Sequence, residues 1–301
     1  MIFGKTLLIY NPISGPDKKR VPVEIIKANL DIAEIKYDSL VTTHRGHAAE
    51  YLNNNHPAYK TIICSGGDGT VNEILNSPGL NHTHQILLIS QGTGNDLQRS
   101  LNGHRNPRIF DFKAYRRLQK LDVGVIEGKY SNGALFRKRF CNAVGVGLDS
   151  LIAKYVSELK KRNNFSYILS LLKAILHYKP VKCSVVNGKK TFSNKMVLLS
   201  INNGKTSGGG FYLAPDALLD DRKLDLCFIN NLSKFRIIKH FPKVLNNRIK
   251  EFKEVDLVQG EQFSVTLETP YYLHIDGEME DLPVKEFRVF LEEETKSFLL
   301  Q

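Results

Sequence analysis

Short apolar runs alternate with turn residues along the first third of the chain and predict a domain of alternating strands and helices. The runs are short, are followed by turn clusters, and are typical of strands in a parallel sheet. A helical pattern over Val21–Leu30 separates the first two. This order of elements predicts a doubly wound α/β domain. The expected strands are Thr6–Tyr10, Ile35–Val41, Thr61–Cys64 and Gln85–Ser90.

The pattern changes near Leu121, where short strand-like runs replace the alternation of strands and helices. Asn187-Gly188 lies between two such runs and is a strong hairpin signal. We therefore expect an antiparallel, β-sandwich-like second domain. The expected bounds are 1–122 for the first domain, joined by the C-terminal tail at about 293–301, and 123–292 for the second. The expected strands are Asp122–Ile126, Arg137–Val146, Val181–Val186, Lys190–Ile201, Leu224–Ile229, Phe263–Leu267, Tyr272–Ile275 and Phe287–Leu291.

A helical insert interrupts this second half from about Leu148 to Tyr178. Apolar residues recur there at i, i+3, i+4 and i+7 in two segments, which predicts two amphipathic helices. A basic turn, Lys160–Phe165, separates them. One interpretation is two helices packed on the sheet with a solvated turn. The other is an interfacial surface that meets anionic lipid headgroups.

Composition narrows the class of protein and of partner. The 301 residues, 42% of them hydrophobic and 24% charged, indicate a globular chain that exceeds one typical domain. The net charge of +11 predicts attraction to an anionic partner, such as a nucleotide, nucleic acid or an anionic membrane surface, although a basic surface also serves solubility. No recognised nucleic-acid-binding module accompanies the charge.

Cysteine placement and the absence of long apolar runs predict a cytoplasmic protein. The chain begins in a strand without the pattern of a signal peptide, and no apolar run approaches the ~18 residues that a spanning helix needs. The cysteines lie far apart in apolar runs, which is typical of small buried hydrophobes in a reducing compartment. They are Cys64, Cys141, Cys183 and Cys227. The histidines show no metal-binding spacing, so zinc and haem are unsupported.

Three turn clusters follow three of the predicted parallel strands, at Asn11–Gly15, Ser65–Glu73 and Gly92–Asp96. Ligands of such sheets bind beyond the carboxyl ends of the strands. A glycine turn that opens a helix offers free N–H groups to an anion. A carboxylate at that place repels phosphate unless a cation lies between them, so Asp68 is interpreted as a direct or water-mediated Mg²⁺ ligand. The alternative is a tight strand–helix turn in which Asp68 is a cap.

Taken together, these motifs resemble the catalytic-domain signature of the diacylglycerol kinase and lipid kinase family, in particular its soluble bacterial diacylglycerol kinase B and YegS-like members. The resemblance continues through nearly the whole chain. It includes Gly208-Gly209-Gly210, Pro215-Asp216-Ala217, Asp220-Asp221 and Asp276-Gly277-Glu278.

The resemblance implies that the first domain binds ATP. Backbone N–H groups and short hydroxyls suit phosphate oxygens. Close relatives often carry a lysine directly after Ser-Gly, whereas here Pro16 and Asp17 precede Lys18 and Lys19. The residues implicated are Asn11, Pro12, Ile13, Ser14, Gly15, Thr42, Gly66, Gly67, Asp68, Gly69, Thr70, Val71, Asn72, Glu73 and Thr93. For Thr42 and Thr93, ordinary capping is the alternative.

Glu278 is the general base that the resemblance implies. It would accept the proton of an attacking lipid hydroxyl while Mg²⁺ balances the charge of the γ-phosphate. Asp68 and Asp96 complete the expected catalytic set, although Asp96 could also cap the helix that follows it. The chemistry is then expected between the two domains. The alternative for Glu278 is a surface carboxylate in an acidic loop, since Glu280 and Asp281 follow.

A second Mg²⁺, with a structural role, is implied in the acidic loop after Pro215. The resemblance assigns it the side chain of Asp221 and the backbone carbonyls of Leu218 and Lys223, and oxygen ligands suit this hard cation. Relatives have glycine after that aspartate, whereas this chain has Arg222, which accepts a left-handed turn less readily. An acidic turn without a metal is the alternative.

The expected function is an ATP- and Mg²⁺-dependent lipid kinase, with diacylglycerol converted to phosphatidic acid. The alternatives are a small-molecule kinase, such as a NAD kinase or a phosphofructokinase, and a non-catalytic nucleotide- or lipid-binding relative. The expected partners are a membrane lipid substrate and, transiently, the anionic inner face of the membrane, where the protein is peripheral. Nucleic acid is not expected as a partner, and the family favours a homodimer.

Overall fold

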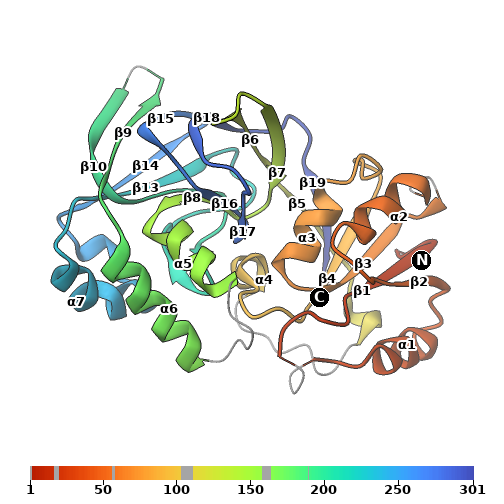
Figure 1. Ribbon diagram of the computed structural model, residues 1–301. Coiled ribbons are helices and arrows are strands. Elements are labelled where there is room, and N and C mark those ends of the chain that lie inside the picture. The colour runs from red at the N-terminus through yellow and green to blue at the C-terminus, as the bar shows by residue number, and fades with distance from the viewer. Residues whose placement is uncertain (1, 17–19, 56–57, 103–110, 158–163, 189) are drawn as a thin grey trace. The chain divides into compact units, whose positions relative to one another are not determined.

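The computed structural model describes residues 2–16, 20–55, 58–102, 111–157, 164–188 and 190–301 (Figure 1). Lys18, Lys19 and most of the basic turn at 160–165 lie outside the described residues. The chain divides into two compact units, Met1–Val123 with Glu293–Gln301, and Gly124–Glu292.

The first unit is built on a six-stranded sheet that is largely parallel. Four neighbouring strands run in parallel, β19 adds to them in parallel, and β5 closes the edge in the antiparallel sense. The strand order explains why the three turn clusters meet, because β1, β3 and β4 are neighbours. In sheet order the strands are β2 (Tyr37–Val41), β1 (Thr6–Tyr10), β3 (Thr61–Gly66), β4 (Gln85–Ser90), β19 (Lys296–Leu300) and β5 (Arg117–Leu121).

Helices cover both faces of this sheet, as a doubly wound domain requires (Figure 1). Leu8 and Tyr10 of β1 pack with Ile26 and Leu30 of α1 in one apolar cluster. Residues of β1 and β3 are buried at every position, because helices lie above and below them. The helices are α1 (Val23–Ile32), α2 (His47–Asn55), α3 (Asp68–Leu75) and α4 (Asp96–Asn102), with the 3₁₀ turn η3 at Phe112–Ala114.

The second unit contains an eleven-stranded antiparallel sheet, which confirms the expected β-rich second half. Its inner side chains form one large apolar core that includes Phe140, Phe228 and Phe263. The main path is β17 (Glu278–Met279), β16 (Leu273–Ile275), β8 (Ala143–Gly147), β10 (Lys190–Asn202), β9 (Val181–Asn187), β15 (Gln262–Tyr271), β18 (Val284–Leu291), β6 (Gly124–Tyr130) and β7 (Leu135–Phe140). β13 (Leu224–Asn230) branches from β10 and pairs with β14 (Val255–Gly260), and β11 (Thr206–Ser207) pairs with β12 (Phe211–Tyr212).

Three helices of this unit pack together over a second apolar cluster. Two of them, α5 (Leu148–Ser157) and α6 (Asn164–His177), form the expected helical insert. The third, α7 (Lys234–Leu245), has no counterpart in the sequence prediction and is followed by the 3₁₀ turn η4 (Ile249–Glu251). Within the described part of the chain, no helix is both long enough and apolar enough to cross a membrane.

Two local predictions are tested directly. The hairpin at Asn187-Gly188 is confirmed, since Lys190 of β10 pairs with Asn187 of β9 and Gly188 has φ +58°. The single strand expected over Arg137–Val146 is wrong, because the chain breaks at Cys141-Asn142 between β7 and β8. The N–H groups of that break bind the carboxylate of Asp276, a residue far along the sequence.

Candidate active site

The three turns at the carboxyl ends of β1, β3 and β4 pack backbone against backbone. A Cβ added to Gly15, which has φ +68°, would lie 1.8 Å from the carbonyl oxygen of Gln91. A Cβ added to Gly92 would lie 2.7 Å from the Cα of Gly67. Side chains at these positions would therefore separate the turns, and glycine is required for the close approach rather than only for bending.

Asp68 joins two of these turns. Its carboxylate oxygens accept hydrogen bonds from the N–H groups of Asn95 (2.7 Å) and Asp96 (3.0 Å). Each carboxylate oxygen has a second lone pair, so these bonds leave acceptor capacity for a cation or its water. Asp68 is thus a link between β3–α3 and β4–α4, and the expected magnesium role stays a prediction.

The neighbouring predicted residues complete the same edge. Asn11 donates from its side chain to Thr70 Oγ1 at 2.9 Å and accepts from the Ile13 N–H at 3.1 Å. Thr42, at the end of β2, is buried, and its N–H donates to the Tyr10 carbonyl at 2.9 Å. The two β-strand ends are thereby tied together beside the turns.

The predicted nucleotide residues differ in accessibility. Ile13 is 84% exposed, and Thr93 is also exposed at the tip of its turn. Ser14, Gly66, Thr70 and Asp96 are buried, whereas Pro12, Gly15, Gly67, Asp68, Gly69, Val71, Asn72 and Glu73 are partly exposed. Burial raises the pKa of the Cys64 thiol below this edge, and the Glu73 and Asp68 carboxylates raise it further. Cys64 is therefore an inert core residue, as expected from its position in an apolar run.

Arg20 is a residue of this site that sequence reasoning missed. Its guanidinium donates to the carbonyl oxygens of Ser14 (2.9 Å) and Gly15 (3.1 Å). The relatives' lysine after Ser-Gly drew attention to Lys18 and Lys19, and an arginine five residues after Gly15 carried no comparable signal. Arg20 thus holds the turn by its carbonyl groups.

A buried hydrogen-bond acceptor lies in the turn that follows β4. The side-chain oxygen of Asn95 is buried and accepts no hydrogen bond from the described residues. Asn95 also has φ +52°, a left-handed conformation that is uncommon for a residue other than glycine. Such an orphaned oxygen is typical of a site completed by water, an ion or a ligand.

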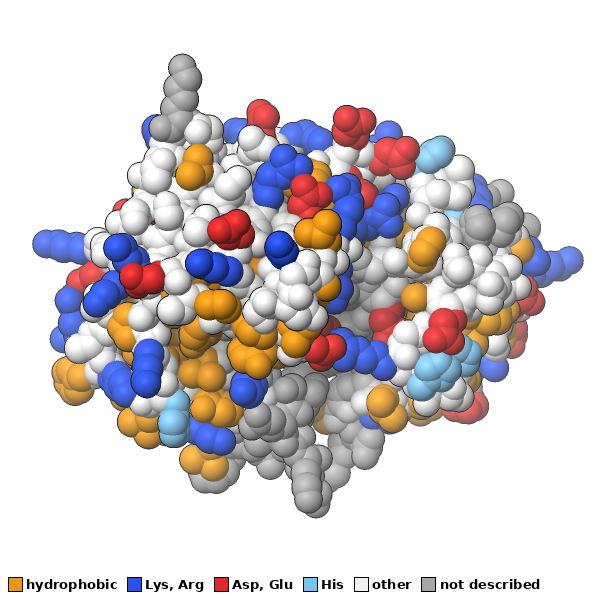
Figure 2. All heavy atoms as spheres, turned by 45° about the horizontal axis from the view of Figure 1, so that its top comes forward, with side chains coloured by type: hydrophobic (Ala, Val, Ile, Leu, Met, Phe, Trp, Pro, Cys, Tyr) orange, Lys and Arg blue, Asp and Glu red, His pale blue; other side chains and the backbone are white. Residues whose placement is uncertain are grey.

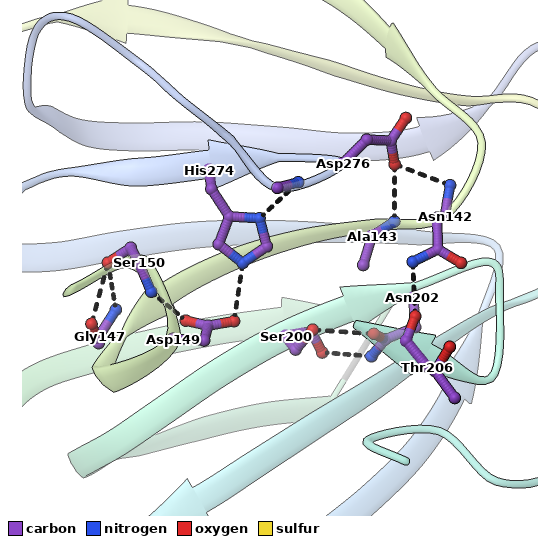
Figure 3. Close-up of polar contacts among 11 residues, drawn as sticks. Asn142, Ala143, Gly147, Asp149, Ser150, Ser200, Asn202, Thr206, His274 and Asp276 are labelled. Atoms are coloured by element: carbon purple, nitrogen blue, oxygen red, sulfur yellow. Dashed lines mark hydrogen bonds and ion pairs between the residues drawn. The ribbon is translucent and has the colours of Figure 1, made fainter. Parts of the chain in front are cut away.

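Glu278 lies in the second unit, directly after a tight turn. Asp276 and Gly277 form the turn with φ values of +50° and +84°, and Glu278 begins β17 with an exposed side chain. The Asp276 carboxylate accepts from the N–H groups of Cys141 (3.0 Å), Asn142 (2.8 Å) and Ala143 (3.0 Å), and Figure 3 shows the last two contacts. The turn before Glu278 is thus anchored at the break between β7 and β8.

The acidic loop after Pro215 makes a tight turn, and its expected metal role stays a prediction. Arg222 has φ +61°, so it adopts the left-handed conformation usually given to glycine. The Lys223 N–H donates to Asp221 Oδ1 at 3.1 Å. Burial raises the pKa of the nearby Asp225 carboxyl to about 6, and Asp221 and Asp216 add to this rise. No cluster of three or more His, Cys, Asp or Glu side chains occurs among the described residues, but one carboxylate with two backbone carbonyls would not form one.

An apolar cavity, part of it open to solvent, lies wholly within the second unit, and its empty space of about 850 Å³ includes that open part. Leu171 of α6 and Phe241 and Val244 of α7 contribute to its walls. Asp149, His274 and Gly277 also line it, and Gly277 immediately precedes Glu278. The mainly apolar lining favours a ligand with a long apolar part.

Comparison with known proteins places both halves of the chain. The family model of the diacylglycerol kinase catalytic domain matches residues 5–126. The model of the YegS C-terminal NAD kinase beta sandwich-like domain matches residues 142–290. The two matches leave only a short segment between them and the chain ends unassigned.

Individual relatives cover most of the chain. The diacylglycerol kinase of Bacillus subtilis is 25% identical over 279 residues, which are 90% of this chain and 88% of the relative. The "Probable lipid kinase YegS-like" protein of Shewanella frigidimarina is 29% identical over 58% of this chain and 56% of its own. A diacylglycerol kinase structure from Bacillus anthracis has a TM-score of 0.68 at 20% identity and covers 100% of this chain and 98% of that one. At that identity the structural likeness supports the fold alone.

Proposed function

Because the chain belongs to the diacylglycerol kinase and YegS-like lipid kinase family and is therefore a kinase, we propose that its acceptor is the hydroxyl of a membrane lipid. The γ-phosphoryl group of ATP is transferred to diacylglycerol, and phosphatidic acid is the product. The apolar cavity of the second unit is the observation that carries the choice of a lipid.

The cavity argues against a small polar acceptor. Most residues that line it are aliphatic or aromatic, and Gly277, next to the proposed base, is also part of the lining. Acyl chains along the apolar walls would leave a glycerol hydroxyl beside Gly277. NAD⁺ or a sugar phosphate would gain little from such walls, because burying polar groups without partners is unfavourable.

ATP is proposed to bind at the three turns of the first unit. Gly15, Gly67 and Gly92 bring these turns together, and the N-terminus of α3, the positive end of the helix dipole, lies beside them. Asp68 and the orphaned Asn95 oxygen supply acceptors that fit a hydrated Mg²⁺. When bound there, Mg²⁺ would neutralise charge on the phosphates.

Glu278 is proposed as the general base. The lipid hydroxyl oxygen forms a bond to the γ-phosphorus, the bond from that phosphorus to the β–γ bridging oxygen breaks, and ADP leaves. The hydroxyl proton passes to a carboxylate oxygen of Glu278. An exposed carboxylate is suited to this step, because its proton can return to water after each turnover.

An anionic membrane surface is proposed as the source of the lipid. The helices α6 and α7, which wall the cavity, also expose apolar side chains, and Figure 2 shows hydrophobic and basic side chains gathered over this part of the second unit. Helix α7 has four cations, Lys234, Arg236, Lys239 and Lys243, and no acidic residue. Apolar residues flanked by cations are typical of surfaces that bind anionic bilayers. The exposed apolar residues are Leu169, Leu172, Leu176, Phe235, Ile238 and Leu245.

An acceptor panel tests the proposal. Labelled ATP is supplied with dioleoylglycerol in mixed micelles, with monoacylglycerol, with NAD⁺, with fructose 6-phosphate, or with no acceptor, each with and without Mg²⁺. We expect label in phosphatidic acid and only with Mg²⁺. Transfer to NAD⁺ or to the sugar phosphate with none to lipid would overturn the proposal, and so would absence of transfer to every acceptor.

A further inference from the structure

A buried histidine links the apolar cavity to the turn that carries Glu278. His274 lies in the centre of β16, and its side chain is 2% exposed. Its Nδ1 accepts a hydrogen bond from the Gly277 N–H at 3.3 Å, and its Nε2 lies 2.9 Å from Asp149 Oδ2 (Figure 3). Because Nδ1 accepts, the proton of a neutral ring is on Nε2 and is donated to Asp149.

The sheet makes room for this pair at one glycine. Gly145 of β8 is the residue paired with His274 of β16. A Cβ added to Gly145 would lie 1.9 Å from Asp149 Oδ2 and 2.3 Å from His274 Nε2. The contact between the two side chains therefore depends on the absence of a side chain at position 145.

Asp149 is itself held in place at the start of α5. Its Oδ1 accepts from the N–H of Ser150 at 2.8 Å, while Oδ2 faces His274. Asp149, His274 and Gly277 all line the apolar cavity. One continuous set of contacts thus runs from the cavity wall through the imidazole ring to the residue before Glu278.

We propose that Asp149 and His274 are positioning residues that set the direction of the Glu278 carboxylate. Asp276 fixes one end of the turn through three N–H groups of the β7–β8 break, and His274 fixes the next peptide through the Gly277 N–H. Asp149 orients the ring by accepting from Nε2. This inference rests on the proposed function, because it assigns Glu278 as the base.

Two substitutions of His274 separate its two contacts. In His274→Asn the amide oxygen lies near the former position of Nδ1 and can still accept from the Gly277 N–H, but the contact with Asp149 is lost. In His274→Gln the amide nitrogen can reach Asp149, but no acceptor remains for Gly277. We expect His274→Asn to keep kcat within about threefold and His274→Gln to lose up to about a hundredfold, because small misplacements of a reacting group have effects of this size. The KM for ATP should not change in either variant.

A double-mutant cycle with Glu278→Gln separates failure of this inference from failure of the proposed function. If Glu278 is the base, Glu278→Gln lowers kcat strongly, and His274→Gln should then add almost nothing, because the two residues act as a unit. Independent, multiplied losses would overturn the positioning role. Full activity of Glu278→Gln would overturn the proposed function instead.

Gly145→Ala provides a second variant that leaves His274 and Asp149 in the chain. The added methyl group would lie 2.3 Å from His274 Nε2 and would push the imidazole ring aside, which moves Nδ1 away from the Gly277 N–H. The loss should therefore be in kcat and should match that of His274→Gln, with the thermal midpoint measured alongside. Equal losses in His274→Asn and His274→Gln, or unchanged kcat in both His274→Gln and Gly145→Ala, would overturn the inference.

Discussion

Asp68 should stabilise the first unit even when no nucleotide or metal is bound. Its carboxylate accepts two backbone N–H groups from the turn that opens α4, at 2.7 and 3.0 Å. A hydrogen bond to a charged acceptor contributes about 1.5–3 kcal/mol, and leaving a buried N–H without a partner costs a similar amount. Asp68→Asn keeps one of the two bonds and turns an amide N–H toward the other donor. We therefore expect a loss of about 2 kcal/mol, and a larger loss for Asp68→Ala.

Differential scanning calorimetry in EDTA measures this effect without metal or ATP. For a unit of this size, about 2 kcal/mol corresponds to a decrease in Tm of roughly 5–10 °C. Glu261→Gln removes one exposed carboxylate from the other unit and serves as the charge-matched control. A carboxylate that only holds a metal would predict the opposite sign, since its removal relieves repulsion with Asp96 and Glu73. An unchanged or raised Tm for Asp68→Asn would refute the reasoning.

Three further predictions follow from the same geometry. Arg20→Ala removes two hydrogen bonds to the Asn11–Gly15 turn and should raise the KM for ATP severalfold, whereas Arg20→Lys should raise it less. Steady-state kinetics that give the same KM for the wild type and Arg20→Ala would contradict this role. Asp221→Asn should lower the thermal midpoint in Mg²⁺ to that of the wild type in EDTA, and a Mg²⁺-dependent shift that persists in the variant would remove Asp221 from the metal loop. In vesicle sedimentation, Phe235→Ser should weaken binding to phosphatidylglycerol vesicles at every salt concentration, whereas Lys239→Gln should weaken it at low salt only, and salt-independent wild-type binding would contradict the electrostatic part.

The apolar pattern of the sequence was sufficient to predict the fold class, because the burial of each strand is reflected in that strand's own residues. Thr6–Tyr10 and Thr61–Cys64 are buried on both faces, so their apolar character reports their environment directly. The sequence also placed the three turns at one edge, because neighbouring parallel strands present the same ends together. The TM-score of 0.68 to a diacylglycerol kinase supports the same architecture.

The features that the sequence did not reveal depend on partners far along the chain. The N–H groups of the break at Cys141-Asn142 donate to Asp276, and Asp149 contacts His274 across 125 positions. Helix α7 was missed although its apolar residues keep helical spacing, because Pro242 lies inside it and proline usually ends or kinks a helix. Arg222 shows the converse, since it adopts a glycine-like φ that its residue type disfavours.

Single-turnover transfer from labelled ATP to dioleoylglycerol is the most direct test of a lipid kinase that uses Glu278 as its base. The wild type should place the label in phosphatidic acid, and Glu278→Gln should slow that step by about 10²–10⁴ while ATP binding and the thermal midpoint stay unchanged. Label in phosphatidic acid at the wild-type rate from Glu278→Gln, or no labelled lipid from the wild type, would contradict the account.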